Sequence, residues 1–227
     1  MEEVQLNYNN AGIPEASNDT MQDLIDEQTR LNDNLLRETN AKNRNKYEVD
    51  LANNTKQVLE AFIKKQNRRI SEMHFPSLHG IVDLDVLKVF NYGNLNALYF
   101  SPGHITQIIN IPQRIQLLYA PNNAIETMAD LPPELEVLQL SKNQLQTIDL
   151  TGSSKLKELY VSYNKLKQLD RLPRSLHTLY CSFNLLSNLD LYGLRLRTLY
   201  CQHNPRLQLL HVPDTIDKGI YEDDIIH

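Results

Sequence analysis

Cysteine, glycine and tryptophan are scarce in this chain of 227 residues, and these shortages exclude several classes of protein. Two cysteines are too few for a disulfide scaffold and fit a reducing compartment. The seven glycines form no phosphate loop, G-x-G-x-x-G or G-x-S-x-G motif. No histidine, cysteine and carboxylate set has the spacing of metal ligands. We therefore predict no catalytic residue, metal, cofactor or small-molecule substrate.

Long apolar runs and an excess of positive charge are also missing. No stretch approaches the roughly 20 apolar residues that a membrane helix needs, so no membrane insertion is expected. The start, "MEEVQLNYNN", is acidic and lacks the apolar region of a cleaved signal peptide. The net charge is −5 and the pI about 5.8, which does not favour a nucleic-acid binder. These features predict an intracellular, cytoplasmic protein.

Most of the chain is built from a repeat of 20 or 21 residues. Six clear repeats begin with Leu95, and apolar residues recur at positions 1, 4 and 6 of each. The aligned segments are LNALYFSPGHI, IQLLYAPNNAI, LEVLQLSKNQL, LKELYVSYNKL, LHTLYCSFNLL and LRTLYCQHNPR. Position 9 is Gly103 in the first repeat and asparagine in the other five, namely Asn123, Asn143, Asn164, Asn184 and Asn204. A weaker stretch, LDVLKVFNYGN from Leu84, is interpreted as a preceding repeat.

This pattern resembles the leucine-rich repeat, L-x-x-L-x-L-x-x-N-x-L. Each repeat then contributes a short parallel strand, and stacked repeats bury a continuous core. The asparagines are expected to bond backbone groups where the chain leaves each strand, as a structural ladder. Apolar residues of the second half of each repeat, such as the pair Leu166 and Leu169, are expected to face inward. The short repeat and the L-P-x-x-L segments resemble bacterial type III-secreted effectors and leucine-rich-repeat proteins of large DNA viruses. That resemblance places the protein in a host cell.

Two amphipathic helices are expected before the repeats. The first begins near Ser17, and the second is predicted from about Thr55 to Met73, with "NAKNRNK" interrupting the helical pattern between them. The resemblance to secreted effectors also implies a helical hairpin at this place. The hairpin is interpreted as a cap over the first repeat, while the alternative is an oligomer formed through these helices. The basic run from Lys64 to Arg69 fits either a cationic helix end or a targeting signal.

Tyrosine dominates the outward-facing position 5. We expect these residues to form a column on the concave face and to bind a protein partner, together with aromatic residues at position 8. The candidate partner-binding residues are Tyr99, Tyr119, Tyr160, Tyr163, Tyr180, Phe183, Tyr200 and His203. The other interpretation is that repeat duplication copied the tyrosines, which stack on one another.

Charge changes sign along the repeats. Residues 111–150 contain five acidic and two basic residues, whereas residues 155–206 contain nine basic and three acidic ones. The acidic residues after Leu210 are interpreted as a C-terminal cap or as a lid over the basic half.

The sequence predicts an α/β leucine-rich-repeat solenoid with parallel strands on its concave face and an N-terminal helical hairpin cap. The predicted ranges are a flexible N-terminus at 1–17, the hairpin at 18–74, repeats at 75–210 and an acidic tail at 211–227. The predicted function is a non-enzymatic protein–protein interaction module. Two alternatives stay open: a structural subunit of a virion or larger complex, and, less favoured, nucleic-acid or polyanion binding by the basic C-terminal repeats.

The two cysteines, Cys181 and Cys201, occupy position 6 of the repeat, where other repeats carry core residues. We therefore expect buried thiols that behave as small apolar side chains. His203 is expected to point away from Cys201, which disfavours a shared metal.

Overall fold

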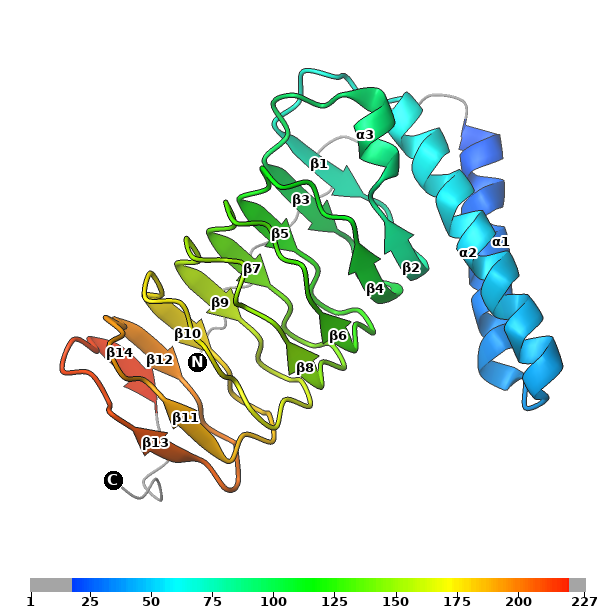
Figure 1. Ribbon diagram of the computed structural model, residues 1–227. Helices are drawn as coiled ribbons and strands as arrows, with labels where there is room; N and C mark the ends of the chain where they lie inside the picture. Colours follow the sequence, from blue (N-terminus) through cyan, green and yellow to red (C-terminus); the bar gives the residue numbers. More distant parts are fainter. Residues whose placement is uncertain (1–17, 221–227) are drawn as a thin grey trace.

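A computed structural model of the protein describes residues 18–220, with side chains described for 21–217. It is an elongated solenoid with two long helices at its N-terminal end (Figure 1). The helices are α1 (Asn18–Arg37), α2 (Ala41–Lys64) and the short α3 (Val86–Phe90). The predicted flexible N-terminus, 1–17, lies outside the described residues.

One long parallel sheet runs the length of the solenoid. Its order is β1-β3-β5-β7-β9-β10-β12-β14, so each repeat adds one strand beside the preceding one. The eight strands are β1 (Glu72–Phe75), β3 (Ala97–Phe100), β5 (Leu117–Tyr119), β7 (Val137–Gln139), β9 (Glu158–Tyr160), β10 (Thr178–Tyr180), β12 (Thr198–Tyr200) and β14 (Lys218–Ile220).

Six other strands line the opposite side of the described solenoid and form three separate pairs (Figure 1). They are β2 (His79–Asp83) with β4 (His104–Ile109), β6 (Thr127–Met128) with β8 (Thr147–Ile148), and β11 (Asn188–Asp190) with β13 (Gln208–Leu210). The core lies between the two sides.

The repeat pattern sets this core. Positions 1, 4 and 6 are buried in all six repeats, and position 4 is completely inaccessible to solvent in each. The pair Leu166 and Leu169 also faces inward, as predicted. Burying one such side chain stabilises the folded state by about 1.5–3 kcal/mol. A single repeat of 20 residues cannot bury these side chains alone, so this stabilisation requires neighbouring repeats to stack on one another.

The helical hairpin covers the N-terminal end of this core. Val58, Leu59 and Ile63 of α2 are buried in the same cluster as the repeat leucines, and Phe62 contacts Phe75 of β1 with ring centroids 5.5 Å apart. The Thr55 hydroxyl donates to the His79 carbonyl at 2.7 Å. The hairpin therefore caps the solenoid, as predicted from the need to cover the first repeat.

The bounds predicted for the second helix were wrong. α2 begins at Ala41, with the side chain of Asn40 accepting a hydrogen bond from the Lys42 amide at 3.0 Å, and it ends at Lys64. The "NAKNRNK" segment therefore starts the helix. Met73 belongs to β1, paired with Leu98.

The stretch from Leu84 is not a repeat strand, because it contains α3. The additional repeat starts earlier, at Ile70, and places Met73 and Phe75 in register with Leu98 and Phe100. At the other end, β14 pairs with β12, so the described part of the predicted tail extends the sheet. Residues 221–227 lie outside the described part.

Candidate functional site

The tyrosine column occupies the outer face of the long sheet. We use this name for Tyr99, Tyr119, Tyr160, Tyr180 and Tyr200, which the strand register aligns at position 5. Ring centroids lie 4.8 Å apart for Tyr99–Tyr119, 5.0 Å for Tyr160–Tyr180 and 4.6 Å for Tyr180–Tyr200. These stacked rings are half-buried, so each ring is held against its neighbour.

Two other residues lie in line with this column, one at its end and one within it. His74 of β1 stacks on Tyr99 with 4.4 Å between ring centroids, and it extends the aromatic row by one strand. Gln139 lies in register between Tyr119 and Tyr160 and separates the row into two stacks. The sequence did not single out His74, because the repeat that contains it starts 25 residues before Leu95 rather than 20.

The pKa is raised for three column hydroxyls, those of Tyr99, Tyr160 and Tyr180, which favours their protonated form. Burial, followed by the Glu72 carboxylate, raises the pKa of Tyr99. Burial raises the pKa of Tyr180, with smaller contributions from Tyr200 and Glu158. Burial also raises the pKa of Tyr160, whose hydroxyl donates to the Glu158 carboxylate at 2.7 Å. These three hydroxyls therefore lie beside two acidic groups, Glu72 and Glu158.

A second aromatic row, the rim ridge, lies where the strands of the last three repeats end. It consists of Tyr163, Phe183 and His203 at position 8. The ring centroids are 4.2 Å apart for Tyr163–Phe183 and 4.1 Å for Phe183–His203. The ammonium of Lys142 lies 5.6 Å from the centroid of the Tyr163 ring, a cation–π distance. The last three repeats therefore contribute residues both to the column and to the rim ridge.

The position 9 asparagines connect neighbouring repeats inside the solenoid. Asn164 illustrates the arrangement: its side-chain oxygen accepts from the Leu145 amide at 2.9 Å, and its NH₂ group donates to the Leu140 and Val161 carbonyls at 3.0 Å each. The same kind of bonds to the preceding repeat is made by Asn123, Asn143, Asn184 and Asn204. These side chains are buried, and their role is to hold the strand ends in register.

Ion pairs connect the acidic part of the repeat array, residues 111–150, to its basic part, residues 155–206. Lys155 bonds Glu134 at 2.6 Å, and Lys157 bonds Glu136 at 2.7 Å, each across neighbouring repeats. These pairs are exposed and therefore contribute little to stability. They neutralise two lysines of the basic half, so the remaining positive charge lies further along the chain.

The cysteines belong to the core, as predicted. Neither forms a disulfide bond, both have almost no exposed surface, and burial raises the pKa of Cys181 well above its ordinary value. His203 is exposed whereas Cys201 is buried, so the two do not face a common site. Within residues 18–220, no group of three or more potential ligands is arranged to hold a metal ion. None of the helices in that range is long and apolar enough to cross a membrane.

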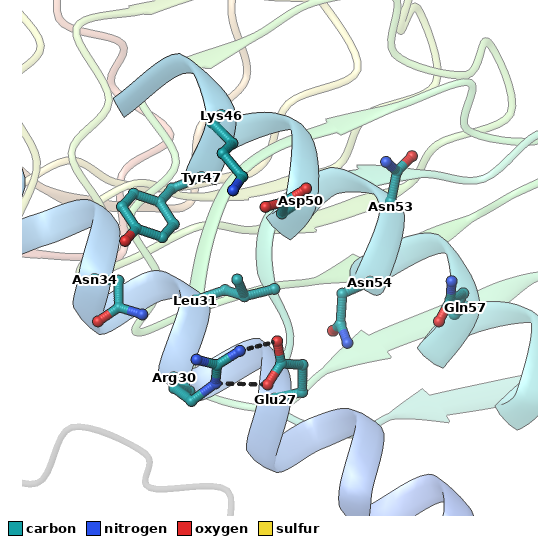
Figure 2. A pocket seen from close by; sticks show the side chains of 10 residues that line it. All are labelled: Glu27, Arg30, Leu31, Asn34, Lys46, Tyr47, Asp50, Asn53, Asn54 and Gln57. Carbon is teal, nitrogen blue, oxygen red and sulfur yellow. Dashed lines mark hydrogen bonds and ion pairs between the residues drawn. The ribbon is translucent and has the colours of Figure 1, made fainter. Parts of the chain in front are cut away.

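A polar hollow of about 470 Å³ lies between α1 and α2. Figure 2 shows the Arg30 guanidinium paired with the Glu27 carboxylate beside Leu31, with Asp50 and Asn54 on the facing helix. The side-chain oxygen of Asn54 is buried and has no hydrogen-bond partner among the described residues. This hollow could not be predicted from the sequence, because its lining residues come from two helices and follow no motif.

Comparison with known proteins agrees with this architecture. No family model and no curated protein matches the chain. Among solved structures, YopM, a leucine-rich effector from Yersinia pestis, is 25% identical with a TM-score of 0.54, over 89% of this chain and 54% of its own. The leucine-rich-repeat domain of a Shigella effector is 27% identical with a TM-score of 0.46, over 54% of each chain. YopM from Yersinia enterocolitica is 22% identical with a TM-score of 0.40, over 69% of this chain and 42% of its own.

This chain spans about half the length of the solved chains it matches. The match to the Yersinia pestis effector includes most of this chain. The protein is thus a leucine-rich-repeat solenoid that resembles bacterial effectors, and its fold is that of a protein-interaction module.

Proposed function

We propose that this protein is a non-enzymatic interaction module that binds a partner protein on the outer face of its long sheet. The binding surface centres on Tyr160, Tyr180 and Tyr200 and includes the rim ridge beside them. The observation that supports it is the ordered stack itself. Stacking fixes the rings in the free protein, so little side-chain entropy remains to be lost on binding.

The stacking geometry favours a protein over a nucleic acid. Single-stranded nucleic acids bind by placing bases on open aromatic faces. Both faces of the Tyr180 ring are covered, by Tyr160 on one side and Tyr200 on the other. The column therefore offers ring edges and hydroxyl donors, which suit the side chains and backbone of a protein partner.

The setting of this activity is also a proposal. Likeness to effectors and two buried cysteines that form no disulfide bond support a place of action inside a host cell.

The test is capture of partners by the full chain, identified by mass spectrometry, followed by mutation of the column. Replacing Tyr160, Tyr180 and Tyr200 with alanine should weaken capture by about tenfold or more, as loss of central aromatic anchors does. The matched control is Tyr192→Ala, which removes an exposed tyrosine from a loop away from the column.

A second variant separates the hydroxyls from the stack. Replacing the same three tyrosines with phenylalanine keeps the rings and removes the donors. Intermediate capture by this variant would show that the hydroxyls contribute. Unchanged capture by the triple alanine variant, with an unchanged circular dichroism spectrum, would refute the proposed surface.

A further inference from the structure

The rim ridge occupies a backbone position that does not favour aromatic residues. Tyr163, Phe183 and His203 have φ angles of 58°, 55° and 59°, in the left-handed region. Glycine and asparagine adopt this conformation most readily, and bulky side chains do so at a cost. The same place is occupied by Asn122 in the second repeat, with φ 55°, and by Lys142 in the third, with φ 58°. The fold itself therefore accepts polar residues here, and three stacked aromatic residues in succession call for another reason.

The ridge is also poorly covered by the rest of the molecule. Tyr163 is 38% exposed and Phe183 is 37% exposed, although both are large apolar side chains. Leu185, two residues beyond Phe183, is 52% exposed. An exposed apolar cluster on a protein surface usually marks a place where another molecule docks. Residues that break a local structural preference are likewise concentrated at functional sites.

The segment that follows each ridge position is basic or neutral up to position 15, which is Asp149, Asp170 and Asp190 in three of the last four repeats. Positions 6 to 14 of the last four repeats contain four basic residues and no aspartate or glutamate. The basic residues are Lys142, Lys165, Lys167 and Arg206, and all four are exposed. The same positions of the second repeat contain Glu126 and no base. Positive charge therefore begins one repeat before the ridge and flanks Phe183 on both sides, while the repeat of Phe183 itself contributes none at these positions.

We propose that the rim ridge binds an acidic peptide segment of the partner protein, with aromatic or aliphatic side chains set between its carboxylates. The apolar side chains contact Tyr163, Phe183 and Leu185, and the carboxylates lie near Lys165 and Lys167. This inference rests on the proposed function and adds the chemistry of the partner to it. Adjacent ridge rings cover one another, and this again favours a peptide over bases that need open ring faces.

The experiment selects short random peptides on the immobilised full chain and measures the winners by fluorescence anisotropy. We expect enrichment of aspartate and glutamate next to phenylalanine, leucine or tryptophan, with affinity that falls as salt rises. Phe183→Asn should weaken binding by about tenfold or more while moving the thermal midpoint by only a few degrees. The shift is small because asparagine suits the left-handed position and offsets the lost ring contacts.

A charge variant gives an independent measurement. Lys165→Glu with Lys167→Glu alters exposed side chains and leaves the core unchanged, so it should fold and lose the acidic peptides. Tyr192→Asn is the matched control and should bind them normally. A labelled single-stranded oligothymidine is the competing probe. Tighter binding of this oligonucleotide than of the selected peptides would overturn the inference.

The results distinguish this inference from the proposed function. Selected peptides without acidic enrichment, or acidic peptides that bind Phe183→Asn and the charge variant normally, overturn the ridge assignment. Peptides that overturn the ridge assignment in this way can still lose affinity for the triple alanine variant of Tyr160, Tyr180 and Tyr200. In that case the proposed binding on the sheet face is retained and only the ridge assignment is rejected.

Discussion

Replacing Asn164 with alanine tests whether the asparagine ladder holds the solenoid together. The side chain makes three short bonds, to the Leu145 amide and to the Leu140 and Val161 carbonyls. The two carbonyls keep a second donor in the variant, because Asn143 donates to Leu140 at 3.0 Å and Asn184 donates to Val161 at 2.9 Å. The Leu145 amide loses its side-chain acceptor. The cost is therefore concentrated in one buried N–H group and is about 3 kcal/mol.

That cost is a substantial fraction of the roughly 5–15 kcal/mol of stability of a typical domain. Urea denaturation followed by far-UV circular dichroism gives the free energy of unfolding, and the slope of the transition shows whether the repeats still unfold together. The control is Asn188→Ala, which alters an exposed asparagine of β11. A loss in Asn164→Ala no greater than in this control would refute the ladder as a source of stability.

Two further predictions concern pH and thiol reactivity. Burial, followed by the charge of His104, lowers the pKa of His79 to about 4, so the folded state favours the neutral ring. An unfolded histidine titrates near 6.5, so stability should fall as the pH drops from about 6.5 to about 4, by about 3 kcal/mol at most. Thermal midpoints of the wild type and His79→Gln across this range check the effect, and parallel curves would contradict it. Cys181 and Cys201 should react with a thiol reagent only as fast as the protein unfolds, and rapid labelling at neutral pH would show that the core placement is wrong.

The repeats could be predicted from the sequence because their signal is local and periodic. Position 4 is apolar in every repeat from Leu95 onward, and the same spacing gives the strand register. The column and the ridge also follow from it, since residues at equal positions of neighbouring repeats must lie side by side. The relation between Cys201 and His203 follows in the same way.

The N-terminal part was harder to predict for physical reasons. The first ten residues of α2 contain no buried side chain, so they show no apolar period, and only the Asn40 cap marks the start. The repeat from Ile70 was missed because α3 lengthens it, which breaks the period of 20. The left-handed backbone of the rim ridge also has no signal in the sequence, since aromatic residues rarely adopt it.

The asparagine ladder has a consequence for how such a protein changes over generations. Each ladder asparagine bonds only its own repeat and the one before it. Duplication or deletion of one whole unit therefore recreates every internal bond at the new junction. The outer face can lengthen or shorten by one strand at a time, while point substitutions at positions 5 and 8 alter its chemistry independently of the core.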